Sequence, residues 1–262
     1  LSMSKSNYGI GPIDVAACRT SVMLLKSAPP EQVIGLIEID RKIMAQHPGL
    51  YLKLLPLYMD SETSPVKTGG AYLFDSYENA VSFDRWLMND LVVDGVAYTQ
   101  RDVLLEMTSK AWHVVGAHNL KDLYTQQTIM RVEDWTAPTA CTSERLAAEW
   151  ESLLDKAKNA GYSAVWLLHD DELKNISIIT TFDAEACIAE INGENIFSRL
   201  DSIPRISEEM ELFTKAEKTF DRSSYVFNVW FPISGTAEDQ DALWPNKFLL
   251  PAKAIGSPSV AI

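Results

Sequence analysis

Histidine is the side chain best suited to accept a proton near neutral pH, and the chain holds four of them. His113 and His169 lie within apolar stretches that read as strands, so we predict these two as candidate general bases. The alternative is that each is a hydrogen-bonded core residue or lies on a solvated face. His47 precedes Pro-Gly at a predicted helix end and His118 ends a strand, so both are interpreted as structural. No pair has metal-ligand spacing such as His-x-x-x-His, and we expect no metal.

The seven tryptophans are many for a chain of 262 residues. Indole rings stack well on flat aromatic ligands, so we predict that several of them border a cavity for a large aromatic molecule. Core packing is the alternative for any single one. Polar groups within apolar strands join the set, because a buried polar group must find a partner. The predicted substrate-binding residues are Tyr72, Trp86, Trp112, Arg131, Trp166, Asn228 and Trp230.

Arg131 is the predicted anion holder of this set. Strand alternation places it on the same face as Glu133 and Trp135, opposite Met130 and Val132. Because the apolar side of the strand should pack against helices, we expect Arg131 to point away from them, into a cavity. The alternative is that Arg131 forms an ion pair with Glu133 or another carboxylate.

Composition excludes several classes of partner. The formal net charge is -13, with a sequence pI of about 4.7, which argues against a nucleic-acid footprint or a polybasic membrane surface. The three cysteines lie far apart and indicate neither a disulfide framework nor a zinc knuckle. No apolar run is long enough to span a bilayer, and no signal peptide is visible, so we expect a cytoplasmic protein.

The chain reads as two similar halves. When residues 15–58 are placed over 127–170, Arg19 falls on Arg131 and Gly49 falls on Gly161. The order and spacing of apolar runs then agree over roughly one hundred residues per copy. The predicted boundaries are 13–122 for the first repeat, 126–231 for the second, and 232–262 for a Pro-containing tail.

Each half predicts the order strand, helix, strand, strand, helix, strand. In the first copy these elements are expected at 17–25, 31–46, 50–59, 71–75, 77–91 and 110–118, with room for an extra helix within 94–108. In the second they are expected at 127–135, 141–159, 162–169, 176–182, 184–191 and 209–218, with an additional strand at 225–231. Ser143 is the predicted cap of the helix that begins near Cys141.

This order is that of a ferredoxin-like unit, whose sheet carries helices on one face only. The other face needs a cover, which a second unit can supply. The sequence therefore predicts an α+β fold in which two ferredoxin-like repeats form an intrachain α+β barrel with a binding cavity between their sheets.

One stretch of the first half is specific enough to resemble a known family. Residues 47–83 contain Pro48-Gly49-Leu50, a strand, a polar loop, and then the run Gly69-Gly70-Ala71-Tyr72-Leu73-Phe74 before a helix that includes Ala80. This pattern is similar to that of the YdhR-type monooxygenase-like proteins of the dimeric α+β barrel superfamily. The second half keeps the layout but has Ser177-Ile178-Ile179-Thr180-Thr181 instead of the Gly-Gly run.

A duplicated chain of this type resembles the ring-opening oxygenases of angucycline antibiotic biosynthesis (jadomycin, gilvocarcin and kinamycin type). The resemblance implies an oxygenase of secondary metabolism that cleaves a carbon–carbon bond of a polycyclic aromatic polyketide quinone or phenol. It implies O2 and reduced flavin (FADH2) as co-substrates, a flavin reductase as partner, and no tightly bound cofactor. Arg131 would then hold a quinone oxygen or a flavin phosphate. The exposed sheet edges and the tail also predict a homodimer.

Four alternatives stay open at this point. Related small barrels oxidise anthrones without any cofactor, and larger members of the superfamily bind haem through a histidine. A non-catalytic, cyclase-like module would bind a polyketide without consuming oxygen. An interaction domain whose cavity is filled by its own side chains would bind no small molecule.

Overall fold

The computed structural model describes residues 10–26, 43–44, 47–58, 67–121, 128–183 and 205–230. Of the predicted helix at 31–46, only residues 43–44 are described, and they are helical. The predicted helix at 184–191 and the tail 232–262 lie outside the described residues. Of the described residues, 17–111 and 227–230 belong to one compact unit, called the first unit below. Residues 10–16 and 112–226 belong to the other, the second unit.

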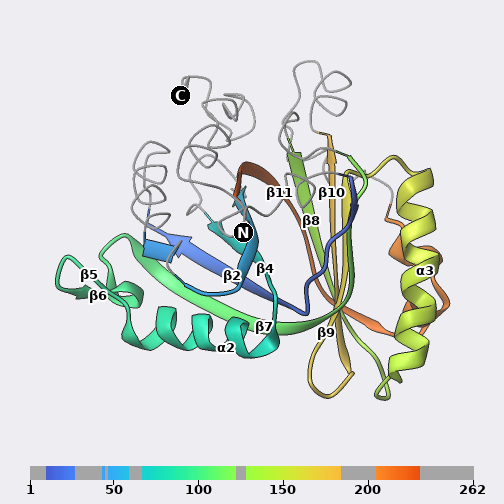
Figure 1. The fold of residues 1–262 in the computed structure, drawn as a ribbon, viewed down its shortest axis with the longest axis horizontal. Helices are drawn as coiled ribbons and strands as arrows, with labels where there is room; N and C mark the ends of the chain where they lie inside the picture. The colour runs from blue at the N-terminus through green and yellow to red at the C-terminus, as the bar shows by residue number, and fades with distance from the viewer. Residues whose placement is uncertain are drawn as a thin grey trace, which may run out of the picture. The chain divides into compact units, whose positions relative to one another are not determined.

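The first unit contains an antiparallel sheet with one helix described against it (Figure 1). Its strands are β2 (Ala17–Leu25), β3 (Leu50–Tyr58), β4 (Lys67–Phe74) and the first half of β7 (Leu104–Asn119). They are ordered β7-β2-β4-β3, and β4 pairs antiparallel with both of its neighbours. The helix α2 (Tyr77–Arg85) continues as a π-helical turn over Trp86–Asp90.

The start of α2 follows from its cap. The side chain of Ser76 accepts a hydrogen bond from the backbone N–H of Asn79 at 3.2 Å, which satisfies one of the free donors of the first turn. Ala80 and Phe83, three residues apart, then turn inward and are fully buried. This face of α2 packs on β4 residues Tyr72 and Phe74 and forms the core of the first unit.

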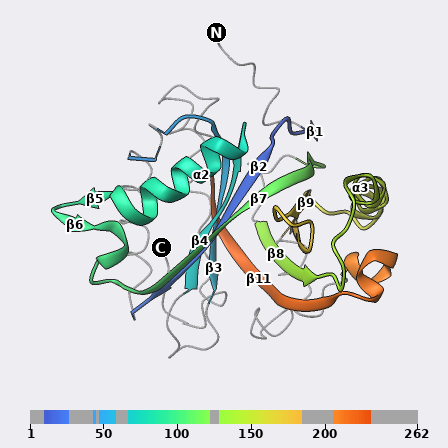
Figure 2. The same cartoon turned by 90° about the horizontal axis from the view of Figure 1, so that it is seen from below.

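The second unit repeats this layout with different side chains. Its strands are β8 (Thr128–Thr136), β9 (Ala164–His169), β10 (Asn175–Asp183), β11 (Glu217–Trp230), the second half of β7 and the short β1 (Gly11–Pro12). The helix α3 (Ser143–Asn159) packs beside β9, as Figure 2 shows nearly end-on. Thr142, one residue before the predicted Ser143, caps α3 by accepting from the N–H of Arg145 at 3.2 Å.

Both units have the strand order of a ferredoxin-like sheet. Counted along the chain, the fourth strand lies next to the first, followed by the third and the second: β7-β2-β4-β3 in the first unit and β11-β8-β10-β9 in the second. The predicted α+β class is therefore confirmed, and the pairings within each unit are antiparallel. The duplication of the sequence and the domain boundaries at 122, 126 and 231 stay predictions.

Two predicted elements are wrong. The strand expected at 209–218 is instead a pair of 3₁₀ turns, Ser207–Glu209 and Glu211–Thr214, and β11 begins only at Glu217. The reason is that Met210, Leu212 and Phe213 are all buried, and their uneven spacing fits tight turns rather than an alternating strand. The strand expected separately at 225–231 is the end of this same β11.

The segment 94–108 contains no extra helix of the kind expected. It completes a two-stranded hairpin of β5 (Val92–Val93) with β6 (Val96–Ala97), followed by a single 3₁₀ turn at Tyr98–Gln100 and then by β7. Asp94 and Gly95 both have positive φ, at 52° and 80°, which forms the tight turn that closes a hairpin and interrupts a helix.

Candidate functional site

Arg19 lies on β2 in the first unit, on the face that α2 covers. Its side chain is 0% exposed. The guanidinium Nε donates to Oδ1 of Asp84 on α2 at 2.6 Å. Within the described ranges, neither Nη1 nor Nη2 of Arg19 has a hydrogen-bond partner. Buried charged groups are almost always hydrogen-bonded, so the Nη end of this arginine calls for an explanation.

Asp84 fixes the orientation of this guanidinium from one side only. The same carboxylate oxygen, Oδ1, also accepts from the hydroxyl of Ser109 on β7. The carboxylate is therefore tied to a strand and to Arg19 at once, although α2 itself carries it.

Aromatic rings surround the guanidinium. Its central carbon lies 5.1 Å from the ring centroid of Tyr72 and 5.4 Å from that of Phe83, within the range of cation–π contacts. A second buried cation, Lys53 on β3, places Nζ 4.7 Å from the Tyr72 centroid. Tyr72, predicted as a substrate-binding residue, thus lies between two positive charges.

The Gly-Gly run makes this arrangement possible. A Cβ on Gly70 would overlap the ring of Tyr72, which therefore needs a glycine at that position. Gly69, with φ of 151°, allows the backbone of β2 to approach at Ser21, where a Cβ would overlap the carbonyl oxygen. The residues that carry the family resemblance thus bring Tyr72 and Arg19 together.

The aromatic cluster continues beyond Phe83, whose ring also contacts the rings of Trp86 and His47. The Trp86 and His47 rings lie 5.7 Å and 5.0 Å from the Phe83 ring, and 5.7 Å from each other. Nδ1 of His47 lies 3.2 Å from the carbonyl oxygen of Pro48. Burial lowers the pKa of His47, and the contact with Pro48 opposes this only in part. His47 is therefore neutral at pH 7 and able to accept a proton.

These side chains form one candidate site within the first unit, which we call the Arg19 site: Arg19, His47, Lys53, Tyr72, Phe83, Asp84 and Trp86. It combines flat apolar rings with a buried cation whose Nη donors have no partner among the described residues, a half-buried neutral imidazole and a second buried cation. Such a set fits an aromatic ligand that carries an anionic or carbonyl oxygen.

The two histidines predicted as bases are brought together, but outside the Arg19 site. His113 on β7 and His169 on β9 are cross-strand partners in the second unit, with ring centroids 5.1 Å apart. Nε2 of His113 lies 2.6 Å from Oδ1 of Asp171, and the His113 side chain is 32% exposed. Nδ1 of His169 lies 2.7 Å from the carbonyl oxygen of Asp170. The pair is a partly solvated cluster beside a turn.

Trp112 and Trp166 are fully buried on the opposite face of the same strands. The α3 face is identified by Gly116, where a Cβ would overlap the Trp150 ring of α3. Gly116 pairs with Leu167, so Trp166 points to the other side. The predicted bases and these two predicted aromatic walls therefore do not share a cavity. The indole N–H of Trp166 has no hydrogen-bond partner among the described residues.

The orientation predicted for Arg131 is wrong, because this residue lies on the helix-covered face. Glu133, on the same face of β8, accepts a hydrogen bond at 2.8 Å from Ser207 in the 3₁₀ turns, and Trp135 packs on Phe213 there. Apolar residues could not indicate the helix side, because both faces of β8 are buried: Ile129 and Met130 are as inaccessible as Arg131.

Arg131 belongs to a charge network rather than to an open site. Its Nε and Nη2 donate to the two carboxylate oxygens of Asp221 on β11, at 2.9 and 3.3 Å. Arg205 and Lys218 also donate to Asp221, at 2.7 and 3.3 Å. Burial acts to raise the pKa of Asp221, but Arg131 and then Arg205 outweigh it and hold that pKa below its ordinary value. Arg131 therefore forms an ion pair, as the alternative prediction stated, and its partner is Asp221.

Asn228 and Trp230 complete the predicted set. Both lie among the last residues of the strand β11, in the part that belongs to the first unit, where the structure describes the backbone only. Their predicted role in substrate binding stays a prediction.

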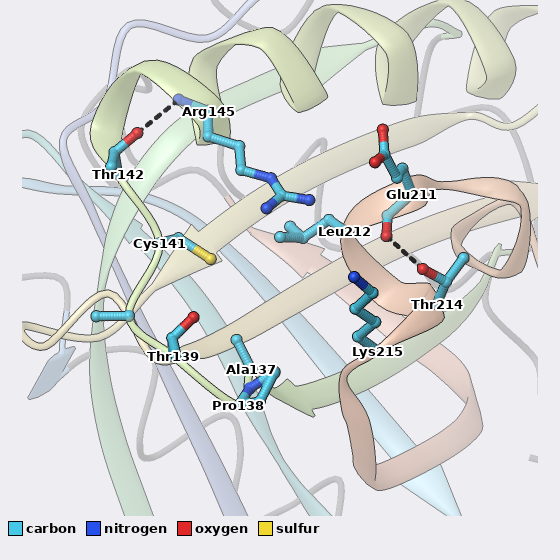
Figure 3. A pocket seen from close by; sticks show the side chains of 11 residues that line it. Ala137, Pro138, Thr139, Cys141, Thr142, Arg145, Glu211, Leu212, Thr214 and Lys215 are labelled. Atoms are coloured by element: carbon cyan, nitrogen blue, oxygen red, sulfur yellow. Dashed lines mark hydrogen bonds between the residues drawn. The ribbon is translucent and has the colours of Figure 1, made fainter.

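A surface pocket of about 300 Å³ lies elsewhere in the second unit, between the start of α3 and the 3₁₀ turns. Figure 3 shows the charged ends of Arg145 and Lys215 and the sulfur of Cys141 turned toward it. Burial raises the pKa of the Cys141 thiol, which disfavours the nucleophilic thiolate. The lining contains no aromatic ring and none of the predicted site residues, so this pocket does not suit a flat aromatic ligand.

The sequence predicts only Tyr72 and Trp86 of the Arg19 site and misses its other five members, among them Arg19 and His47. Arg19 was noted only as the repeat mate of Arg131, and His47 only as a helix-ending residue. A signal for His47 was present, since it immediately precedes Pro48-Gly49 in the pattern that carries the resemblance. Arg19 joins the site through its register with Tyr72, which the sequence does not show.

Among the described residues, no group of three potential metal ligands comes together. None of the described helices is both long and apolar enough to cross a membrane.

Comparisons with known proteins show similarity of fold. No protein-family model matches the chain, and no curated protein matches its sequence. A solved structure named "putative monooxygenase", from Fusobacterium nucleatum, aligns with a TM-score of 0.50 at 12% identity, covering 81% of this chain and 91% of that one. A protein of the same name from Lactobacillus acidophilus gives 0.47 at 8% identity, covering 81% and 93%. An anthrone oxidase-like protein gives 0.48 at 11% identity, covering 86% and 97%.

At these identities the comparisons concern the fold alone. The chain shares the α+β fold of the Fusobacterium protein. Its activity has to be argued from its own site.

Proposed function

We propose that the chain is an oxygenase that acts on a polycyclic aromatic phenol or quinone, bound at the Arg19 site. The observation that carries this proposal is the fully buried guanidinium whose two Nη atoms have no hydrogen-bond partner among the described residues and whose central carbon lies near Tyr72 and Phe83. The name of the Fusobacterium protein of similar fold agrees with an oxygenase. Secondary metabolism and a polyketide substrate are part of the same proposal.

In this reaction His47 acts as the general base. In the tautomer protonated on Nδ1, that atom donates to the carbonyl oxygen of Pro48, and Nε2 is the basic nitrogen. Nε2 takes the phenolic proton, and the Arg19 guanidinium stabilises the resulting anion. The surrounding rings exclude water from this electron-rich anion, which then reacts with O2.

The electron balance distinguishes two forms of this chemistry. An anthrone-type methylene can be oxidised to a carbonyl by O2 alone, because one oxygen atom enters the product and the other leaves as water. Oxygen insertion with ring opening of a quinone requires two further electrons, which reduced flavin from a reductase would supply. The Arg19 guanidinium suits a flavin phosphate as well as a quinone oxygen by charge, so the flavin requirement has to be measured.

An oxygen electrode tests the proposed function directly. The full chain is mixed with a panel of anthrones and angucycline-type quinones, with and without FAD and a flavin reductase. Uptake above background that depends on both the protein and the aromatic compound is the expected result. Uptake without flavin assigns the cofactor-free reaction, and uptake only with reduced flavin assigns the flavin-dependent one. Binding of these compounds without any uptake contradicts an oxygenase and favours a non-catalytic binding module.

The base is tested by comparing histidines. His47→Gln should lower turnover at least about 100-fold, because it removes the proton acceptor. His113→Gln, at the solvated cluster, is the matched control and should retain turnover. The acidic limb of the wild-type pH profile should fall below pH 6.5, since burial lowers the pKa of His47. A large loss in His113→Gln with normal turnover in His47→Gln would return the role to the histidine that the sequence predicted.

A further inference from the structure

We infer that the surface pocket at the start of α3 binds a phosphate group, either as the free ion or at the end of a small organic molecule. The pocket has a volume of about 300 Å³, which is within the range of small-ligand sites. It belongs to the second unit and the Arg19 site to the first, so this ligand is separate from the aromatic substrate of the proposed function. The ligand class follows from two cations in the lining, Arg145 and Lys215.

These two cations approach the pocket from different elements. Arg145 lies in the first turn of α3, and Lys215 directly follows the 3₁₀ turn Glu211–Thr214. Figure 3 shows both charged ends turned into the same space. Neither of them forms an ion pair with another described residue. Cations that converge on one concave space repel each other and attract an anion, and the positive end of the α3 dipole adds to this field.

The walls of the pocket are held in place by the protein itself. The backbone N–H of Cys141, at the end of the loop 137–141, donates to the carbonyl oxygen of Leu173 in the turn between β9 and β10, at 2.7 Å. On the other wall, the hydroxyl of Thr214 donates to the carbonyl oxygen of Glu211 at 2.8 Å. A ligand that enters such a preformed space has little main chain to order, which favours binding.

The geometry of the donors favours phosphate over a carboxylate. The planar fork of Arg145 binds two oxygens at once, and the ammonium of Lys215 acts as a point charge on a third. A phosphate group offers three such oxygens and up to two negative charges, whereas a carboxylate offers two oxygens and one charge. The hydroxyl of Thr139 also belongs to the lining and can donate to the same group. Apolar lining residues leave room for the carbon atoms of a monoester: Ala137, Pro138, Ala140 and Leu212.

Glu211 is the acidic member of the lining, and its charge opposes an anion. This opposition makes the sign of the ligand testable. Removal of the Glu211 charge should tighten phosphate binding, whereas removal of either cation should weaken it. A cationic ligand would give the reverse of all three effects, and a zwitterion would be weakened by each of the three changes.

Cys141 serves as the reporter of occupancy, because its partly exposed side chain turns its sulfur toward the same space. The full chain is treated with iodoacetamide at increasing concentrations of inorganic phosphate or glycerol phosphate. Sodium chloride and sodium acetate at equal ionic strength are the reference salts. Peptide mass spectrometry measures the alkylation rate at Cys141. Both phosphate compounds should slow it with a saturable midpoint, and the lower midpoint identifies the free ion or the monoester as the better ligand.

Charge variants then locate the ligand. Arg145→Gln and Lys215→Gln should each raise the phosphate midpoint at least about 10-fold, as expected for the loss of a charge-assisted hydrogen bond. Glu211→Gln should lower it about 3-fold. Lys158→Gln, which removes the same charge at the other end of α3, is the matched control and should resemble the wild type. Rates are compared with and without phosphate in each variant, because burial raises the pKa of Cys141 and Arg145 opposes this effect.

Several results would overturn the inference. One is an alkylation rate at Cys141 that neither phosphate compound changes, and another is equal protection by chloride or acetate. Midpoints that are the same in the wild type and in both cation variants, each folded by circular dichroism, would place the phosphate elsewhere. Weaker binding by Glu211→Gln would exclude a simple anion. Oxygen uptake enters none of these measurements, so the phosphate site and the oxygenase can fail separately.

Discussion

Arg19 and Arg131 fall on each other in the predicted repeat, and both are buried on the helix-covered face of a sheet. Their surroundings differ sharply. Arg131 shares Asp221 with Arg205 and Lys218 in a network that spans β8, β11 and the 3₁₀ turns. Among the described residues, Arg19 contacts a carboxylate only through Nε, its Nη atoms have no hydrogen-bond partner, and aromatic rings lie near its central carbon.

This difference separates a structural arginine from one retained for binding. A buried ion pair that is fully hydrogen-bonded recovers much of its desolvation cost within the protein. A buried arginine with two unpaired nitrogens recovers less, and stability alone gives no reason to keep it. Local departures of this kind are expected where a site must stay ready for a ligand.

The largest expected effect is on the stability of the two arginine variants. Arg131→Met should lower the free energy of unfolding by about 2–4 kcal/mol, because buried Glu133 and half-buried Asp221 then keep fewer cations. Arg19→Met should change it by less than about 1 kcal/mol in either direction, because it removes an under-satisfied charge and leaves Asp84 bonded to Ser109. Urea unfolding of the full-length variants measures both. Equal losses would mean that Arg19 is structural too.

The Gly-Gly run offers a second, somewhat smaller test. Gly70→Ala should cost about 1–3 kcal/mol, because the added Cβ overlaps the Tyr72 ring and overpacks the site. The double variant Gly70→Ala with Tyr72→Ala should cost less than the sum of the single changes, since the clash is then absent. Thermal unfolding of the three variants gives the coupling. Strict additivity would show that Gly70 serves the backbone and not Tyr72.

The charge network should also have its own pH dependence. Burial raises the pKa of Glu133, more than Ser207 and Arg131 lower it, so the folded state resists losing this proton. The contribution of Glu133 to stability is thus greatest at low pH and declines as pH rises above 4.5 toward the raised value. Asp221, whose pKa is lowered, has the opposite sign and loses its contribution only as pH falls below 3.8.

Glu133→Gln isolates the first of these effects. The amide keeps an acceptor for Ser207 but cannot ionise, so the variant should match the wild type near pH 4 and become modestly more stable by pH 7. Urea midpoints from pH 4 to 7 provide the comparison. A variant that is less stable at pH 7 would show that the carboxylate charge is needed by Arg205 and Lys218.

The sequence predicts much of the framework and little of the site. Alternating and apolar runs located β2, β3, β8, β9 and β10 within a few residues, because strand periodicity is a local property. The orientation of Arg131 could not be predicted, because both faces of β8 are buried. The alternation of side chains then does not indicate which face packs against the helix.

The assembly of the Arg19 site depends on pairings between distant segments. Arg19 meets Asp84 across 65 positions of the chain, and Asp84 meets Ser109 across 25. No local pattern marks Asp84 as the partner of a buried arginine. The resemblance at Gly69–Phe74 predicts part of the site, because it identifies the strand on which Tyr72 lies.

The smallest expected effect concerns two buried serines, one in each region. The hydroxyls of Ser21, beside Arg19, and Ser223, the register partner of Arg131, both lack a hydrogen-bond partner among the described residues. Replacing an unpaired buried hydroxyl by hydrogen removes a desolvation cost, so Ser21→Ala and Ser223→Ala should each be neutral or stabilising by up to about 1 kcal/mol. If Ser21 faces the aromatic ligand of the proposed function, only Ser21→Ala should also weaken binding of the anthrones and quinones. Equal binding by both variants would exclude Ser21 from the recognition of that ligand.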